Sequence, residues 1–118
     1  MSFFQSRDGT QLHEQTWAPT GKATASVVLV HGYGEHIGRY DETGRALAAA
    51  GFSVHGLDLR GHGQSAGVRG FCNRFDEYLE DVDALVARAR AESLPLFLVG
   101  HSFGALIAPF YALAHPGT

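Results

Sequence analysis

The sequence predicts an α/β fold, in which a mostly parallel sheet carries helices on both faces and is opened by a β-hairpin. Three observations predict this class: two short alternating stretches begin the chain, apolar runs follow at intervals, and amphipathic segments separate those runs. Apolar runs are typical of strands covered on both faces, and a helix between two such strands makes them parallel. We therefore interpret residues 1–118 as part of a single α/β domain.

The first elements form the antiparallel edge of the predicted sheet. Residues 2–7 and 11–17 alternate between apolar and polar side chains, as half-buried strands do. Asp8 and Gly9 lie between them and suit a tight hairpin turn. Residues 25–30 are almost continuously apolar, which predicts a central parallel strand.

The first helix is expected over residues 39–50, which are rich in helix formers and are followed by Gly51, a residue suited to a helix C-cap. Residues 52–57 then form the next parallel strand. One face of this helix carries Tyr40, Leu47 and Ala50.

The second helix follows a glycine-rich loop at residues 58–75 and is expected to end at Leu94 and Pro95. Acidic residues gather near its start and basic residues near its end, the arrangement that the helix dipole favours. Residues 96–99 are interpreted as a further buried strand that leads into a third helix. The apolar residues at helical spacing in the second helix are Leu79, Val82, Leu85, Val86 and Ala89.

Composition narrows the function classes. The chain is 45% hydrophobic and 18% charged, which is ordinary for a globular protein. Its net charge of -3 and its scattered basic residues disfavour a nucleic-acid partner. Cys72 is the only cysteine, so we expect no internal disulfide, no cysteine zinc site and a cytoplasmic setting. We also expect no transmembrane segment and no signal peptide.

The strongest motif joins the strand at residues 96–99 to the third helix. In the pattern G-x-S-x-G, a sharp turn lifts the serine hydroxyl clear of the sheet, and the flanking glycines avoid collisions across that turn. The serine itself accepts a strained backbone. The position between a strand and a helix favours Ser102 as a nucleophile over a structural turn. The motif consists of Gly100, His101, Ser102, Phe103 and Gly104.

A second glycine-rich segment directly follows the strand at residues 25–30. Acyl transfer needs at least two N–H donors directed at the oxyanion; one follows the nucleophile and another comes from this earlier loop. The backbone N–H groups of Tyr33 and Phe103 occupy these positions, which favours an oxyanion loop over a simple turn. Glu35 and Arg39 fit either contacts with the polar head of a substrate or a surface role. The segment consists of His31, Gly32, Tyr33, Gly34, Glu35 and His36.

Three motifs together resemble the monoacylglycerol lipase and lysophospholipase group of α/β hydrolases. They are HGYGEHIGRY at residues 31–40, DLRGHGQS at residues 58–65 and GHSFG at residues 100–104, and their order and spacing match that group. The resemblance implies the α/β-hydrolase fold and a serine hydrolase that cleaves carboxylic esters through an acyl-enzyme on Ser102. It implies monoacylglycerol or lysophospholipid as substrate, peripheral contact with membranes, and no metal or organic cofactor. Phe103 in place of the usual methionine changes a pocket wall and leaves the donor atoms unchanged.

The partners of a catalytic triad are missing after the nucleophile. In α/β hydrolases the acid and the histidine follow the serine in the chain. After Ser102 there is no Asp or Glu, and the one histidine, His115, would lie about 20 Å away at the far end of a helix. The resemblance implies a lid and further strands and helices that bring the acid and the histidine, so we expect residues 1–118 to be the N-terminal half of the domain and to be inactive alone. The sheet order that the resemblance implies would leave the strand at residues 96–99 with an open apolar edge prone to self-association.

Other assignments of the same residues are weaker. Asp58 and His62 precede the nucleophile, so we do not place them in a triad; a salt-linked turn between Asp58 and Arg60 is expected instead. A non-catalytic hydrolase-like scaffold and a dinucleotide-binding domain stay open as other function classes. For the second of these, Gly38 falls one position late for G-x-G-x-x-G and Glu35 would face the pyrophosphate.

Overall fold

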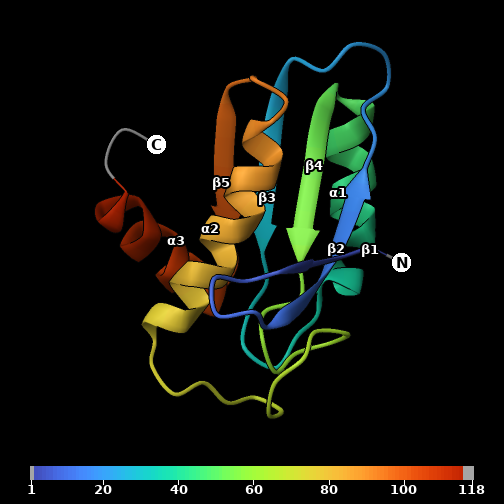
Figure 1. Ribbon diagram of the computed structural model, residues 1–118. Helices are drawn as coiled ribbons and strands as arrows, with labels where there is room; N and C mark the ends of the chain where they lie inside the picture. Colours follow the sequence, from blue (N-terminus) through green and yellow to red (C-terminus); the bar gives the residue numbers. More distant parts are fainter. Residues whose placement is uncertain (1, 116–118) are drawn as a thin grey trace.

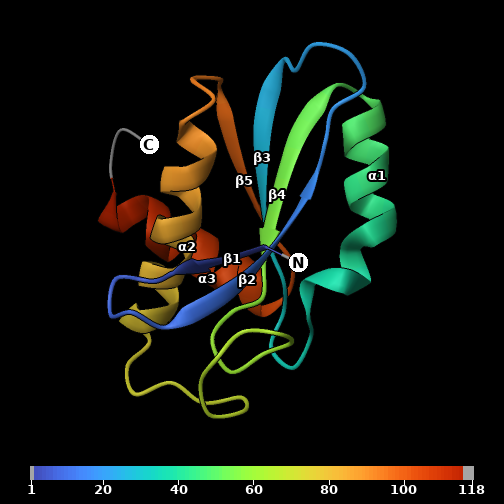
Figure 2. The ribbon, with the colours of Figure 1, turned by 45° about the vertical axis from the view of Figure 1, so that its right-hand side comes forward.

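Figure 1 shows the computed structural model of the chain, in which residues 2–115 are described. Within these residues, five strands form one sheet in the order β1-β2-β4-β3-β5. Figures 1 and 2 show α1 on one face of the sheet and α2 and α3 on the other. The strands are β1 (Ser2–Gln5), β2 (Gln11–Trp17), β3 (Ala25–Val30), β4 (Phe52–Leu57) and β5 (Leu96–Gly100). The helices are η1 (Ile37–Tyr40, a 3₁₀ helix), α1 (Asp41–Ala49), α2 (Asp76–Arg90) and α3 (Phe103–Ala114).

The pairing of the strands confirms the predicted fold class. β1 and β2 form an antiparallel hairpin, and β2 joins β4 antiparallel. β4, β3 and β5 are parallel to one another, with β3 at the centre of the three. The hairpin turn contains Gly9 at φ +88°, and the Gly9 N–H donates to the Ser6 carbonyl at 2.9 Å. The parallel strands therefore end at one edge of the sheet, where the loops meet.

Two apolar cores lie on the two faces of the sheet. The smaller one packs under α1 around Trp17, Ile37 and Val54. The larger one packs under α2 and α3 and includes Leu57 and Ile107. Alternate residues of β4 contribute to opposite cores because side chains alternate across a strand. All six residues of β3 are buried, as expected for a strand covered on both faces.

The first predicted helix is in part wrong. The segment begins as the 3₁₀ turn η1 before it becomes α1. Gly44 and Ala48 are the buried residues of α1, whereas Ala50 is exposed. A methyl group at Gly44 would overlap the Trp17 indole, so α1 packs closely on the sheet through this glycine. Propensity alone could not show that packing, because it depends on a side chain from β2.

Two other boundaries differ from the sequence prediction. β1 ends at Gln5, so its strand is shorter than residues 2–7. α2 ends at Arg90, and a turn that includes Ser93 at φ 56° leads to Pro95. These ends are set by local turns that apolar periodicity does not report.

The strand β5 is not buried as predicted. Its burial alternates, and Phe97 and Val99 keep 56% and 45% of their surface exposed. β5 pairs with β3 on one side only in the described part of the chain. The expectation of an open apolar edge at this strand fits these exposures.

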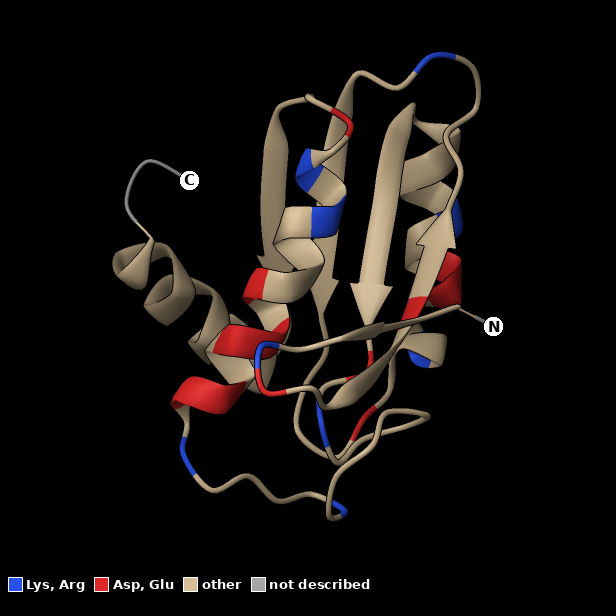
Figure 3. Cartoon of the chain, in the orientation of Figure 1, with Lys and Arg blue, Asp and Glu red and all other residues tan. Residues whose placement is uncertain are grey.

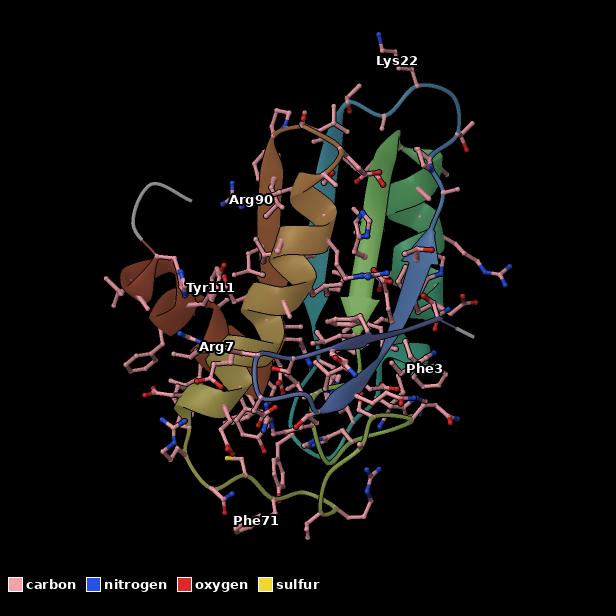
Figure 4. The ribbon with its side chains drawn as sticks, in the orientation of Figure 1. Phe3, Arg7, Lys22, Phe71, Arg90 and Tyr111 are labelled. Atoms are coloured by element: carbon pink, nitrogen blue, oxygen red, sulfur yellow. The ribbon has the colours of Figure 1, made fainter. Side chains whose placement is uncertain are left out.

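Charged residues are distributed over several elements, as Figure 3 shows. Among residues 2–115, no helix is both long and apolar enough to cross a membrane. No group of three or more His, Cys, Asp or Glu in this part of the chain could hold a metal ion. Side chains crowd the end of the sheet where the loops meet, the end at which Phe71 lies, whereas Lys22 lies at the opposite end (Figure 4).

Candidate active site

The turn between β5 and α3 holds Ser102 in a strained conformation. Ser102 has φ 57° and ψ -114°, a region that residues with a side chain rarely adopt, and α3 begins at the next residue. The Ser102 side chain is exposed. A sharp turn between strand and helix therefore presents a hydroxyl at the carboxyl end of the sheet, as the motif predicts.

The two flanking glycines are required by close backbone contacts. A methyl group at Gly100 would overlap the backbone of Gly104 across the turn. A methyl group at Gly104 would overlap the carbonyl of Val30 at the end of β3. The elbow is therefore packed directly against the neighbouring strand, and a side chain at either position would force it open.

The loop after β3 lies against the elbow. A methyl group built at Gly32 would lie 3.2 Å from Cβ of Ser102, so the two segments are in contact. The rings of Tyr33 and Phe103 meet edge to face, with their centroids 5.9 Å apart. Among residues 2–115, neither the Tyr33 nor the Phe103 backbone N–H has a hydrogen-bond acceptor. Both N–H groups therefore lack a partner within the described part of the chain.

The buried side chain of His31 supports the loop after β3. Its Nε2 accepts the Leu59 backbone N–H at 3.0 Å, so the proton is on Nδ1, which donates to the Gly32 carbonyl at 2.6 Å. Burial lowers the pKa of His31, which keeps its ring neutral. A neutral ring can serve both partners at once, so His31 supports the loop and takes no part in proton transfer.

The Glu35 carboxylate, for which a substrate contact and a surface role were both open, is hydrogen-bonded to its own loop and to Tyr40. Its Oε1 accepts the Gly32 N–H at 3.0 Å and the Tyr40 hydroxyl at 2.6 Å. These two hydrogen bonds, that of Tyr40 first, lower the pKa of the Glu35 carboxyl. The turn at Gly34 has φ +76°, which allows Glu35 to fold back on the loop. Because the Glu35 carboxylate occupies the Gly32 N–H, the loop is a poor cradle for a pyrophosphate.

A shallow polar pocket lies beside this loop. His101 is largely exposed, and its Nδ1 lies 3.9 Å from Glu35 Oε2. Arg39 is also exposed at the rim. The Tyr40 hydroxyl, which the sequence analysis did not single out, lies at the centre of this group. The lining residues are Glu35, Arg39, Tyr40, Thr43 and His101.

The expected ion pair between Asp58 and Arg60 is wrong. The Asp58 carboxylate accepts the Ile37 N–H at 2.7 Å and contacts His13 Nδ1 at 2.8 Å. Arg60 pairs instead with the buried Asp81 at 2.7 Å. Both residues follow the end of β4 in a loop, where Asp58 meets β2 and η1 and Arg60 meets α2, so each side chain finds its partner on a distant segment. Asp58 precedes the elbow in the chain and holds separate segments together.

Aromatic rings form an apolar wall next to the elbow. The ring of Phe103 meets Tyr78 at 5.4 Å and Phe75 at 6.2 Å between centroids. His62 meets the Tyr33 ring at 5.3 Å, and its Nδ1 donates to the Arg60 carbonyl. No single stretch of sequence reports this wall, because its members come from four separate segments, namely the loop after β3, the loop before α2, α2 and α3.

The fold and the elbow define an α/β hydrolase, of which this chain has the N-terminal part. The chain is similar to a thermostable carboxyl esterase from Bacillus coagulans, with a TM-score of 0.89 and 33% identity over 98% of this chain and 40% of that one. It is also similar to a lipase in its open form, with a TM-score of 0.83 and 32% identity over 98% of this chain and 40% of that one.

Sequence comparison gives the family. A family model described as Hydrolase_4, serine aminopeptidase S33, matches residues 21–118, and the chain belongs to this family. The chain is 40% identical over 112 residues to the monoglyceride lipase of Homo sapiens, covering 93% of this chain and 37% of that protein. It is 39% identical over 111 residues to the monoacylglycerol lipase of Mycolicibacterium smegmatis, covering 92% of this chain and 40% of that protein. The chain thus spans well under half the length of these relatives.

Proposed function

We propose that residues 1–118 are the N-terminal half of a serine hydrolase domain that cleaves carboxylic esters through an acyl-enzyme on Ser102. The backbone N–H groups of Tyr33 and Phe103 form the oxyanion hole. The substrate class is a monoacylglycerol or a lysophospholipid. No metal or organic cofactor is needed, because the nucleophile and the donors are groups of the chain itself.

The proposed reaction has two steps. The Ser102 oxygen attacks the ester carbonyl, its proton passes to a histidine base, and the carbonyl oxygen becomes an oxyanion between the two N–H groups. The alcohol leaves with that proton, and water then hydrolyses the acyl-enzyme to a free acid. The base and its acid partner come from sequence outside residues 1–118, so the chain alone is inactive.

The observation that carries the proposal is the strained and exposed Ser102 next to the loop after β3, together with the Tyr33 and Phe103 N–H groups, which have no acceptor among residues 2–115. A serine in an ordinary turn needs neither a strained φ of 57° nor two flanking glycines in close backbone contact, so these features favour a functional role for Ser102. The aromatic wall around Phe103 supports an acyl-binding role. Arg39 and the pocket beside Glu35 support contact with a polar head. The similarity to monoacylglycerol and monoglyceride lipases favours the lipid substrate.

A fluorophosphonate probe tests the proposed nucleophile in the full-length protein. We expect covalent labelling that Ser102→Ala abolishes. Ser93→Ala is a matched control, because Ser93 is also exposed and also has a positive φ of 56°. It should leave labelling unchanged. Absence of labelling in the wild-type protein, or labelling that survives Ser102→Ala, would instead favour a non-catalytic scaffold.

We also propose that the isolated residues 1–118 self-associate through the β5 edge. The exposed apolar side chains of Phe97 and Val99 support this, since they line a strand with an unpaired edge. Leu106 and Phe110 on α3 are exposed beside it. Light scattering should show a mass that rises with concentration, and a constant monomer mass would overturn the proposal.

We propose a cytoplasmic protein that contacts membranes peripherally. Cys72 as the only cysteine supports a reducing compartment, and the proposed lipid substrate supports contact with membranes. Cell fractionation tests both parts: the protein should be recovered in the cytoplasmic fraction and in salt-extractable membranes. Recovery from a secreted fraction would contradict the proposal.

A further inference from the structure

The Tyr40 hydroxyl lies between the two segments that form the proposed oxyanion hole. It donates to Oε1 of Glu35 at 2.6 Å, and its oxygen lies 3.1 Å from Nδ1 of His101. A carboxylate only accepts hydrogen bonds, so the single hydroxyl proton of Tyr40 goes to Glu35. His101 therefore carries its proton on Nδ1 and donates it to the Tyr40 oxygen.

The same carboxylate oxygen reaches the oxyanion loop. Glu35 Oε1 accepts the backbone N–H of Gly32 at 3.0 Å, one residue before Tyr33. His101 is one residue before Ser102 on the elbow. A continuous chain of hydrogen bonds, here called the site network, thus joins the loop to the elbow. Its members are Gly32, Glu35, Tyr40 and His101.

We propose that Tyr40 is a positioning residue that sets the separation between the Tyr33 and Phe103 amides by holding Glu35 between the loop and the elbow. This inference rests on the proposed function, because it assigns those two amides to the oxyanion hole. Such donors stabilise a transition state only when they are held in place before the reaction, and small displacements reduce the rate strongly.

The setting of Tyr40 suits this role. Its ring packs on the core under α1, which fixes the position of the hydroxyl. Burial and the Glu35 carboxylate raise the pKa of Tyr40 to about 12, so the hydroxyl stays protonated and remains a donor. The substitution Tyr40→Phe keeps the packed ring and removes only the hydroxyl, so it separates positioning from packing.

The experiment is steady-state ester hydrolysis by the full-length protein. Tyr40→Phe should lower kcat by about tenfold and change KM by less than about twofold, because the oxyanion hole acts mainly in the transition state. Tyr111→Phe is the matched control. The Tyr111 hydroxyl also donates to a carboxylate, that of Asp83 at 2.8 Å, but between α2 and α3, where Figure 4 labels it. It should leave kcat and KM unchanged.

Glu35 variants test whether Tyr40 acts through the carboxylate. Glu35→Gln keeps an acceptor oxygen for Gly32 and Tyr40 and should retain most of kcat, whereas Glu35→Ala should lower kcat as much as Tyr40→Phe does. The double variant of Glu35→Ala with Tyr40→Phe should fall no further, since both changes break the same link.

Three results would overturn the inference. They are a wild-type kcat in Tyr40→Phe, an equal fall in Tyr111→Phe, and additive losses in the double variant. The outcome also distinguishes this inference from the proposed function. If a fluorophosphonate does not label the wild-type protein, the proposed serine hydrolase function is wrong. If it labels the wild-type protein and the Tyr40→Phe variant at the same rate, only the positioning role of Tyr40 is wrong.

Discussion

The sheet carries a polar network at each of its two ends, and the two contrast in burial. At the carboxyl end of the parallel strands, the site network ends on His101, whose side chain is 67% exposed and lies 3.9 Å from Glu35. Toward the opposite end, His55 of β4 is 11% exposed and contacts Glu92 at 2.8 Å and Glu14 at 3.7 Å. We call this second group the sheet network; its members are Glu14, Ser26, Ser53, His55 and Glu92.

The difference between the two networks shows how burial changes the role of the same residue types. Burial opposes the charged form of His55, but Glu14 and Glu92 outweigh that effect and raise its pKa. His55, followed by Arg88, lowers the pKa of Glu14 to about 2 against the effect of burial. The buried charges of the sheet network therefore contribute to folding stability. His101 is exposed, so its interactions add little to stability, and the role of the site network is to position the loop and the elbow.

The largest expected effect compares the two histidines directly. His55→Ala should lower the free energy of unfolding by about 2 kcal/mol, because it removes packing and leaves the buried Glu14 without one of its partners. His101→Ala should cost less than about 0.5 kcal/mol, since the side chain is solvated. Urea unfolding measures both losses. Equal losses of unfolding free energy in the two variants would contradict the proposed difference between the sheet network and the site network.

The pH dependence of stability sharpens the same contrast. The pKa of His55 is raised above its usual 6.5, so its contribution is complete below pH 6.5 and is lost as the pH rises through the folded-state value. The stability difference between wild type and His55→Ala should therefore shrink as the pH rises above 6.5 and through the folded-state pKa, by about 1.4 kcal/mol for each unit that separates the folded-state pKa from the unfolded-state pKa. A difference that stays constant over this range would contradict a charged His55.

His31 at the site end should act with the opposite sign. Burial lowers its pKa, so its contribution is present above pH 6.5 and is lost as the pH falls through the folded-state value. Replacing His31 with Gln should therefore flatten the acid side of the stability profile, measured by urea unfolding at several pH values. If the free energy of unfolding of the variant falls with decreasing pH as steeply as that of the wild type, His31 is not held neutral.

The smallest expected effect concerns a single hydroxyl of the sheet network. The Ser26 hydroxyl donates to Glu92 at 2.8 Å, and that of Ser53 donates to the same carboxylate at 2.7 Å. Because Glu92 is partly exposed, Ser26→Ala should cost about 0.5 to 1 kcal/mol by thermal or urea unfolding. Ser53→Ala should cost a similar amount. A loss above about 2 kcal/mol in either would mean that the network is more strongly coupled than its exposure indicates.

Much of the fold was predictable because it depends on local patterns. The apolar run at β3, the periodicity of α2 and the Asp8-Gly9 turn each predicted an element that the structure contains. The fully buried residues of α2 include Val82 and Leu85, which belong to the predicted apolar face. The open edge of β5 was expected, but the exposure of one of its faces was not, because composition reports an apolar strand and not whether a helix covers each face.

For the candidate site too, local features were predicted from the sequence and contacts between distant segments were not. The motif around Ser102 predicted a sharp turn, and the structure contains that strained turn. The predicted pair of Asp58 with Arg60 was wrong, since each finds its partner on a distant segment. Tyr40 was assigned to a helix face by spacing alone, and its link to Glu35 and His101 was not considered.

By itself, the sequence determined the order of strands and helices, the sharp turn at Ser102 and the glycine-rich loop after β3, because turn chemistry and hydrophobic period act over a few residues. Only the tertiary structure decided which side chains meet: the contact of Gly32 with Ser102, the bridge through Tyr40 and the burial of His55 between two glutamates. These contacts join residues that are far apart in the chain, and they arise only when strands far apart in sequence pack side by side.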